Sequence, residues 1–435
     1  MIQKITGEIQ ISPEKALEIE KEIKTISDLG KKIESLLSVE ATEILEVIFG
    51  GSLVLAASDI HIEPEEERAK IRIRIDGLLQ DLVYLPLQNY NLILSRIKLI
   101  SGIKLNITDK PQDGRFSIIM KDTPVEIRSS SLPAEYGESL VMRILNPKSL
   151  IDLEELGLRE DLLRNFEKEI KKPNGMIIVT GPTGSGKTTT LYSFLKKLST
   201  PEIKIITIED PIEYKLEGIS QTQVNESKGY TFANGLRSIM RQDPDVILVG
   251  EIRDFDTAQI ALQAALTGHL VLSTLHTNDA AGTISRLIDL GVSTASIAPG
   301  INMAIGQRLI RKVCQKCVKF VSVSPEILTK IKKDLSNLPK NVKIPVLDKS
   351  LKIPQAKGCS FCNQTGYRGR IGVFESFFID PEMEKFILSS PSTSEMKELA
   401  IKKGMVPMYQ DGLIKVIEGM TTVEEVERVT GESEK

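Results

Sequence analysis

The sequence contains no tryptophan, and aromatic residues make up only 5% of its 435 residues. A groove that stacks the bases of single-stranded nucleic acid is built from aromatic side chains, so this composition gives such a groove little support. An excess of one charge is also missing, since 56 lysines and arginines face 59 aspartates and glutamates, for a net charge of −3. This balance argues against a protein that coats nucleic acid along its whole surface.

Long hydrophobic runs are absent as well. The longest candidate, residues 47–57, is shorter than the ~18 apolar residues that span a bilayer. The N-terminus has no basic region followed by an apolar core, so nothing in it suggests export, and we expect a cytosolic protein. At roughly 150 residues per domain the length predicts about three folded units, and an apolar fraction of 41% is enough to fill ordinary cores.

Cysteine is rare, and its four copies form two C-x-x-C pairs, Cys314 with Cys317 and Cys359 with Cys362. In a reducing compartment, two such pairs indicate a metal rather than disulfides. Four thiolates fill every position of a tetrahedral Zn²⁺ site, so this zinc would be structural rather than catalytic. The interval between the pairs exceeds the usual zinc-ribbon spacing, which predicts that the lysine-rich segment inside it loops out. Buried free cysteines or a redox pair are the alternatives.

The pattern of apolar residues changes several times along the chain. Ile71, Ile73 and Ile75 alternate with arginines, a period of two that predicts a strand, and Asp76-Gly77 follows as a hairpin signal. Helical and strand-like stretches around this hairpin predict a small α+β domain. We expect six segments: a helical N-terminal arm (1–40), the small α+β domain (41–147), a charged linker (148–172), an α/β core (173–310), a tetracysteine insert (311–370) and a helical C-terminal subdomain (371–435).

Four short apolar runs mark the expected core, separated by helical or irregular segments. The runs are 176–180, 204–208, 246–250 and 270–274. Runs of this kind are typical of buried parallel strands whose sheet is covered by helices on both faces. The core is therefore predicted to be a doubly wound α/β fold.

A phosphate-binding motif follows the first of these runs. Gly181-Pro-Thr-Gly-Ser-Gly-Lys187-Thr188 matches G-x-x-x-x-G-K-[ST], and it lies between a predicted strand and a predicted helix, the context that the motif requires. Its glycines let backbone N–H groups turn toward phosphate oxygens, and the helix N-terminus adds its positive dipole end. Lys187 would contact the β- and γ-phosphates, and the Thr188 hydroxyl would ligate Mg²⁺.

The motif predicts an ATP-type nucleotide as ligand. The alternative is a glycine-rich turn that binds no nucleotide. A guanine nucleotide is disfavoured, because no Asn-Lys-x-Asp segment is found. The predicted nucleotide-binding residues are Gly181, Pro182, Thr183, Gly184, Ser185, Gly186, Lys187, Thr188 and Thr189.

Polar residues follow the other three predicted strands. Glu209 and Asp210 end the second, Glu251 follows the third, and His276 follows the fourth. Ligands of open α/β sheets bind beyond the carboxyl ends of the strands, so these side chains are expected to meet at the phosphate-loop edge. Glu251 would orient the attacking water, Glu209 or Asp210 would hold Mg²⁺ through water, and His276 would sense or stabilise the γ-phosphate. Taken singly, each is as well explained as a helix cap or a solvated strand end.

The other two histidines have structural interpretations. His269 precedes its strand, which places it about a strand length, ~17 Å, from the phosphate edge. We therefore expect a packing or subunit-interface role for His269. His61 lies in the first domain, where a hydrogen-bonded structural histidine is expected.

Taken together, these residues resemble a known family, the secretion ATPases of the type II secretion and type IV pilus assembly (GspE/PilB-like) group. The similarity runs from about Ala57 to Gly431 and is far more specific than the phosphate loop alone. Its motifs are Ala57-Ser-Asp-Ile-His-Ile-Glu-Pro64, Asp113-Gly-Arg115, Thr207-Ile-Glu-Asp-Pro-Ile-Glu213, Val249-Gly-Glu-Ile-Arg253, Thr267-Gly-His-Leu-Val, Ser273-Thr-Leu-His-Thr-Asn278, Gln307-Arg308-Leu309, Thr365-Gly-Tyr-Arg-Gly-Arg370, Asp411-Gly-Leu-Ile-Lys415 and Gly419-Met-Thr-Thr.

The resemblance implies a RecA-like P-loop ATPase core after a PAS-like α+β domain, in an ATP-hydrolysing homohexamer. Such rings work at the cytoplasmic face of the inner membrane, peripheral to it, with a membrane platform protein and, indirectly, prepilin subunits as partners. No nucleic-acid partner is implied. In this family the first domain supplies arginines to the neighbouring subunit's nucleotide, and Arg115 and Arg128 occupy the matching positions. A surface ion pair is the alternative for each arginine.

Two features place the sequence within this family. Pilus retraction ATPases resemble the core but generally lack the tetracysteine insert, so its presence favours assembly over retraction. Only about forty residues precede the similar region, whereas larger members carry a further N-terminal domain that docks to an inner-membrane partner.

The segment 311–357 has eleven lysines and one arginine against three acidic residues. It would face acidic lipid or an acidic partner, or be a solvated loop.

Three other functions compete with an ATP-hydrolysing assembly motor. A DNA- or RNA-dependent P-loop ATPase would use zinc and basic residues on nucleic acid, although the composition supports it little. A nucleotide-gated scaffold would bind ATP without needing to hydrolyse it. A retraction ATPase of the same superfamily is the nearest alternative.

Overall fold

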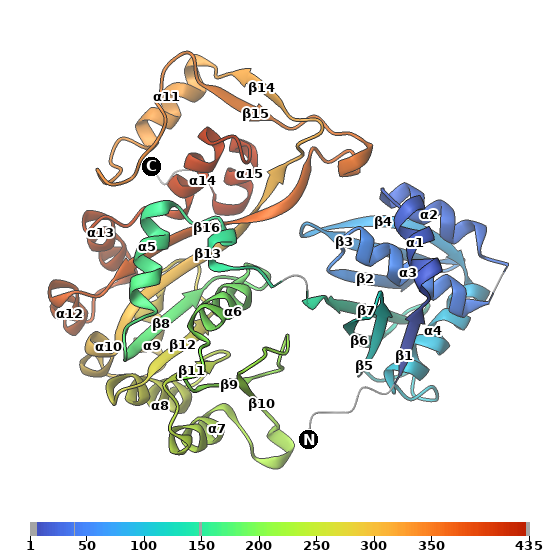
Figure 1. The fold of residues 1–435 in the computed structure, drawn as a ribbon, viewed down its shortest axis with the longest axis horizontal. Helices are drawn as coiled ribbons and strands as arrows, with labels where there is room; N and C mark the ends of the chain where they lie inside the picture. The colour runs from blue at the N-terminus through green and yellow to red at the C-terminus, as the bar shows by residue number, and fades with distance from the viewer. Residues whose placement is uncertain (1–6, 39, 148–149, 432–435) are drawn as a thin grey trace. The chain divides into compact units, whose positions relative to one another are not determined.

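The computed structural model describes residues 7–38, 40–147 and 150–431, which form two compact units (Figure 1). The first unit contains the chain up to 149 together with Cys314–Cys317 and Lys357–Arg368, and the second contains the remainder. The first six residues of the expected arm, the first two of the expected linker and the last four of the expected tail lie outside the described residues. No helix of the described ranges has the length and apolar character to cross a membrane.

The first unit is built on a seven-stranded sheet in the order β1-β5-β6-β7-β2-β3-β4. Phe49, Phe116, Ile127 and Met142 are among the fully buried side chains that join the helices to the sheet. The hairpin signal is confirmed, because Asp76 and Gly77 both have positive φ and connect two paired strands. The strands are β1 (Glu8–Ile11), β2 (Asp59–Pro64), β3 (Arg68–Ile75), β4 (Leu78–Pro86), β5 (Gln112–Met120), β6 (Thr123–Ala134) and β7 (Gly137–Leu145).

The expected N-terminal arm is part of this unit rather than a separate segment. Strand β1 pairs in parallel with β5, with Ile9 opposite Ile118. Helices α1 (Pro13–Glu22) and α2 (Ile26–Ser35) pack with α3 (Ala41–Val54) and α4 (Leu87–Ser101) in the same core. The helical spacing of leucine and isoleucine predicted the helices, but a four-residue strand has too few residues for its period to be recognised.

The second unit contains a seven-stranded sheet in the order β10-β9-β11-β12-β8-β13-β16. The four predicted runs are confirmed as strands β8 (Gly175–Thr180), β9 (Ile205–Glu209), β11 (Val246–Val249) and β12 (Leu270–Leu275). All four run parallel to one another. The sequence pattern did not reveal β10 (Ser220–Gln223), β13 (Ile301–Val313) or β16 (Tyr367–Phe378).

Helices cover both faces of this sheet, as a doubly wound fold requires (Figure 1). On β8, Ile177 and Val179 face one core, with α5 (Glu160–Glu169) and α6 (Lys187–Leu198). Met176 and Ile178 face the other core. That core is formed with α7 (Phe232–Ile239), α8 (Phe255–Leu266), α9 (Gly282–Asp289), α10 (Thr294–Gly300), α12 (Pro381–Leu388) and α13 (Thr393–Lys402).

Two expected boundaries differ from the structure. In the expected linker, Leu153, Leu162 and Phe166 are buried against the β8 face, so η2 (Leu153–Leu156) and α5 belong to the second unit. The expected helical tail begins with strand β16, and its helices start at Pro381. Apolar residues of both regions pack onto one sheet, a consequence of tertiary structure that local patterning does not reveal.

The expected insert divides into two parts. Its lysine-rich middle folds as β14 (Lys319–Ser322), α11 (Pro325–Asp334) and β15 (Lys352–Gln355), with an apolar core shared with α14 (Met408–Ile417) and α15 (Val423–Thr430). The cysteine segments belong to the first unit, where the Asn363 side-chain oxygen accepts a hydrogen bond of 2.8 Å from the Ile26 N–H at the start of α2.

A buried charge cluster joins three parts of the second unit. Asp411 Oδ1 lies 2.5 Å from a guanidinium nitrogen of Arg159, and its Oδ2 lies 2.6 Å from Lys415 Nζ and accepts from the Phe374 N–H. Burial alone would raise the pKa of Asp411, but the two cations lower it. The stabilisation is therefore present above the ordinary carboxyl pKa of about 3.9 and is lost as the pH falls through the lowered value.

Replacing Asp411 by Asn is expected to lower the free energy of unfolding by about 3–5 kcal/mol, because Arg159 and Lys415 would keep buried charges without an anion. The control is Glu160→Gln, which breaks an exposed pair with Arg164 and should cost less than about 1 kcal/mol. Urea denaturation measures both effects. Equal losses in the two variants would show that the buried cluster does not stabilise this unit.

Candidate functional site

The phosphate loop connects β8 to α6 at the carboxyl edge of the sheet. Gly184 and Gly186 have φ of +79° and +89°, which side chains with a Cβ rarely adopt. A Cβ at Gly186 would also lie 2.8 Å from the Gln307 side-chain nitrogen. Glycine is therefore required at position 186 both by the positive φ of the turn and by the close approach of β13. Pro182, Thr183 and Gly184 are exposed, Ser185 is buried, and Thr188 and Thr189 are partly exposed in the first turn of α6.

Lys187 is the first residue of α6 and is folded back over the loop. Its ammonium donates hydrogen bonds to the carbonyls of Gly181, at 2.8 Å, and Pro182, at 3.2 Å. Burial lowers its pKa, while the carboxylate of Glu251 acts in the opposite direction. A buried ammonium beside a helix N-terminus forms a site for a multiply charged anion.

Glu251 and His276 meet at this edge, as predicted. Glu251 follows β11, and His276 follows the neighbouring strand β12. A carboxylate oxygen of Glu251 lies 3.4 Å from His276 Nε2, and the other oxygen is in an ion pair with Arg253. The Thr274 hydroxyl donates to the Gly250 carbonyl at 2.8 Å, and this contact fixes the backbone on which Glu251 is carried.

The two acidic residues after β9 have different environments. Glu209 is buried, and its carboxylate accepts hydrogen bonds from Tyr192, from Thr207 at 2.6 Å and from Gln221 at 3.3 Å. Burial raises the pKa of Glu209. Asp210 instead is 37% exposed and lies 4.0 Å from Arg253, the partner of Glu251. Asp210 is thus the acid available to a ligand at this edge.

Threonine and glutamine side chains hold the loops around the phosphate site. The Thr180 hydroxyl, at the tip of β8, accepts a 2.8 Å hydrogen bond from the Thr277 N–H and lies 2.6 Å from the Thr277 hydroxyl. Thr190 on α6 donates to Gln307 on β13 at 2.8 Å. The loop after β12 is therefore attached to β8, and the start of α6 is attached to β13.

Of the remaining two histidines, His269 lies at the opposite end of its strand from this edge, and His61 belongs to the first unit. His269 precedes β12, whose six residues place it about 20 Å from the end that carries His276. Its Nδ1 lies 3.0 Å from the Ala264 carbonyl. His61 lies on β2 of the first unit, 3.9 Å from the Glu63 carboxylate, and burial lowers its pKa.

Arg115 and Arg128 are direct neighbours in the first unit. They are paired in register on β5 and β6. Both interact with the Glu126 carboxylate, at 3.7 Å from Arg115 and 3.6 Å from Arg128. The two guanidinium groups thus share the Glu126 carboxylate as an ion-pair partner.

The four cysteines form a compact cluster. Their sulfur atoms all lie within 4.8 Å of one another. The separations of Cys314 from Cys359, Cys317 from Cys362 and Cys359 from Cys362 are 3.9, 3.8 and 3.7 Å. Tetrahedral Zn–S bonds of about 2.3 Å require sulfur atoms about 3.8 Å apart, so the residues fit a zinc ion.

Backbone groups around the cluster support the same fit. The N–H groups of Cys359 and Gly366 each donate to the Cys362 sulfur at 3.2 Å. Burial alone would raise the pKa of Cys362, but these donors lower it to about 7. Cys362 is therefore stabilised as a thiolate, the form that binds metal, whereas burial raises the pKa of Cys314 and raises that of Cys317 to about 12.

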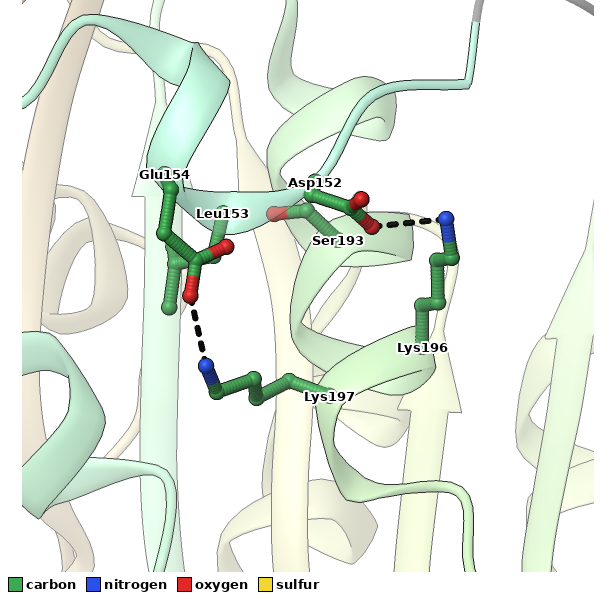
Figure 2. Close-up of a pocket in the computed structure, with 6 residues that line it drawn as sticks. All are labelled: Asp152, Leu153, Glu154, Ser193, Lys196 and Lys197. Carbon is green, nitrogen blue, oxygen red and sulfur yellow. Dashed lines mark hydrogen bonds and ion pairs between the residues drawn. The ribbon is translucent and has the colours of Figure 1, made fainter.

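A surface pocket between η2 and α6 is separate from the phosphate loop (Figure 2). Its walls are tied by ion pairs of 2.6 Å, Lys196 with Asp152 and Lys197 with Glu154. These lysines lie in the last turn of α6, about 14 Å along the helix from Lys187. This pocket is not the predicted ligand site.

Sequence reasoning did not assign roles to Arg253, Gln307 or Thr180. Arg253 follows Glu251 by two residues, but its pairing with that carboxylate depends on the turn after β11. Gln307 lies on a strand whose pattern was not recognised. Only the motifs that contain Arg253 and Gln307 pointed to them, without a function.

The family model described as Type II/IV secretion system protein matches residues 38–428. The type II secretion system protein E of Xanthomonas campestris is 44% identical over 390 residues, which cover 89% of this chain and 67% of that protein. The type IV pilus assembly ATPase PilB of Thermus thermophilus is 42% identical, over 89% of this chain and 42% of that protein. The chain thus spans between two fifths and about two thirds of the length of these relatives.

Solved structures resemble the fold. The DotB ATPase of Legionella pneumophila has a TM-score of 0.64 at 22% identity, over 89% of this chain and 95% of that one. The pilus retraction motor PilT with bound ADP has a TM-score of 0.58 at 26% identity, over 89% and 96% of the two chains. These findings confirm the resemblance that the sequence motifs indicated. The chain belongs to the Type II/IV secretion system protein family.

Proposed function

We propose that this chain hydrolyses ATP and drives the assembly of a type IV pilus or a type II secretion pseudopilus. The observation that carries the proposal is the edge of the second sheet, where the phosphate loop shares one surface with Glu251 and His276. Relatives named as pilus assembly and secretion ATPases support it.

Binding of the triphosphate begins at the loop and the start of α6. The phosphate oxygens would replace the carbonyls of Gly181 and Pro182 as acceptors for Lys187, because an anion is a stronger acceptor for an ammonium. The helix N-terminus adds N–H groups and the positive end of its dipole.

Glu251 orients the attacking water. The water oxygen forms a bond to the γ-phosphorus while the bond from that phosphorus to the bridging oxygen breaks, and ADP and phosphate result. His276 lies within 3.4 Å of the Glu251 carboxylate and would stabilise it or contact the γ-phosphate. The ion pair with Arg253 fixes the second carboxylate oxygen.

Mg²⁺ fits two oxygen-bearing side chains at this edge. Thr188 offers a hydroxyl in the first turn of α6, and Asp210 offers an exposed carboxylate suited to a water-mediated contact. When bound, the ion neutralises charge on the β- and γ-phosphates.

The working form is proposed to be a homohexamer at the cytoplasmic face of the inner membrane, peripheral to it and in contact with a platform protein. Arg115 and Arg128 would approach the γ-phosphate of a neighbouring subunit and stabilise its charge during transfer. Their pairing in register on β5 and β6, which brings the two guanidinium groups to the same place on the sheet, supports this role. The tetracysteine site, which retraction ATPases generally lack, supports assembly over retraction.

Two substitutions separate nucleotide binding from hydrolysis. Lys187→Ala should weaken ATP binding and abolish turnover, because it removes the cation at the phosphates. Glu251→Gln should keep ATP binding and lower turnover by about 10²–10⁴-fold, because the amide cannot act as the base that orients the water. Equilibrium binding and phosphate release measure the two effects, with Glu160→Gln as an exposed control. Full turnover in Glu251→Gln would contradict the assignment.

Metal analysis of the native protein should find one zinc per chain, since four thiolates complete one tetrahedral site. Cys359→Ser should lower that content and the thermal stability of the cysteine segments, while ATP binding remains. Ser360→Ala, at an exposed neighbour, serves as the matched control. Native protein purified without chelator that contains no zinc would overturn the metal assignment.

The cross-subunit role of Arg115 is tested by mixing variants. Rings of Arg115→Ala alone and of Lys187→Ala alone should both hydrolyse little ATP. Mixed rings should regain activity, because a Lys187→Ala subunit supplies Arg115 to a neighbour whose phosphate loop is intact. Arg143→Ala, on the adjacent strand β7, should remain active alone. No regain in mixed rings would place the arginine in its own subunit's chemistry or in structure.

A further inference from the structure

Arg308 lies just beyond the phosphate loop on β13. Gly306 is opposite Thr180, the last residue of β8, so Gln307 and Arg308 continue past the carboxyl end of β8. The Gln307 carbonyl approaches Gly181 so closely that a Cβ there would be 2.5 Å from it. The backbone next to Arg308 is therefore in contact with the phosphate loop.

The guanidinium of Arg308 reaches across the tip of β8. It donates a hydrogen bond of 2.7 Å to the Asn278 carbonyl and a weaker one of 3.3 Å to the Gln307 carbonyl. Asn278 lies in the loop after β12, two residues beyond His276, and β8 lies between β12 and β13. Because His276 contacts Glu251, Arg308 lies at the end of the site where the γ-phosphate is expected.

Arg308 and Lys187 are two neighbouring cations in one partly buried site. Burial lowers the pKa of Arg308, and the charge of Arg308 helps to lower the pKa of Lys187. Within the described ranges, neither side chain has an ion pair with a carboxylate; both donate to backbone carbonyls. Two like charges held this close favour an anion between or beside them.

The two carboxylates that act electrostatically on Arg308 are engaged elsewhere. Glu375 is buried and accepts hydrogen bonds from the N–H groups of Ala280, at 2.8 Å, and Met408, at 3.1 Å. Asp279 accepts from the Gly282 N–H at 2.8 Å, at the start of α9. Arg308 is thus held by backbone carbonyls, which a phosphate oxygen can replace as acceptors.

We propose that Arg308 binds the γ-phosphate of ATP from within the same subunit and thereby distinguishes ATP from ADP. The inference rests on the proposed function, because it names a residue of the same nucleotide site. Its hydrogen bond to Asn278 links the presence of that phosphate to the loop that carries His276. Release of the phosphate would then return the guanidinium to the carbonyls of Asn278 and Gln307.

The test compares the affinities of a non-hydrolysable ATP analogue and of ADP, each with Mg²⁺, in the full-length chain. Arg308→Gln keeps a donor for the Asn278 carbonyl but removes the charge. It should weaken analogue binding by about 10- to 100-fold, the loss typical of one charged hydrogen-bonded contact, and change ADP binding by less than about twofold. Arg308→Lys should restore part of the analogue affinity, and Arg164→Gln, at an exposed arginine, should match the wild type.

Three outcomes would overturn the proposal. An equal loss of analogue and ADP binding in Arg308→Gln would assign Arg308 a structural role in the loop, and unchanged affinities would remove it from the site. If Arg308→Gln also melts well below the wild type, Arg308→Lys decides, because a folded lysine variant without ATP preference contradicts the charge argument. Wild-type protein that binds neither nucleotide would refute the proposed function itself, a result distinguishable from the other three.

Discussion

The parallel arrangement of the second sheet is the constraint on which the site depends. Parallel strands bring all their carboxyl ends to one edge, so residues from β8, β9, β11, β12 and β13 reach the same place although more than a hundred residues separate the first from the last. Each strand contributes one kind of group, and none has the chemistry alone. Helices on both faces keep these strands buried, which makes the edge rigid.

The cations and the acids at this edge have different kinds of partner. Lys187 and Arg308 flank the tip of β8 and donate to backbone carbonyls, which an incoming anion can replace. Glu251 has Arg253 and His276 as its partners, and Glu209 is enclosed among hydroxyl and amide donors. Lys187 and Arg308 can therefore bind phosphate, whereas Glu251 is oriented by its partners and Glu209 is buried. A site arranged in this way attracts a triphosphate and still retains one carboxylate for water.

The expected tetracysteine insert is divided between the two compact units of the protein. The lysine-rich middle buries Leu328, Ile331 and Ile353 in an apolar core that it shares with α14 and α15. The segments that carry the cysteine pairs contain few apolar side chains. They are held by the close approach of the four sulfur atoms and by N–H groups that donate hydrogen bonds to sulfur. So short a segment cannot build an apolar core, and a metal held by the four thiolates would take its place.

The sequence by itself determined the elements whose signals are local: the phosphate loop, the four buried strands beside it, the hairpin at Asp76-Gly77 and the paired cysteines. It also predicted that Glu251 and His276 meet, because the direction of parallel strands fixes which ends converge. Tertiary structure alone decided that Glu209 is enclosed while Asp210 is exposed, that β1 joins the first sheet, and that Arg308 spans the tip of β8. These depend on which side chains happen to be neighbours in space. The spacing of residues along the chain does not reveal which side chains are neighbours in the folded protein. Gln307 and Arg308 lie on a strand that the sequence pattern did not reveal, so their roles can be seen only in the assembled sheet.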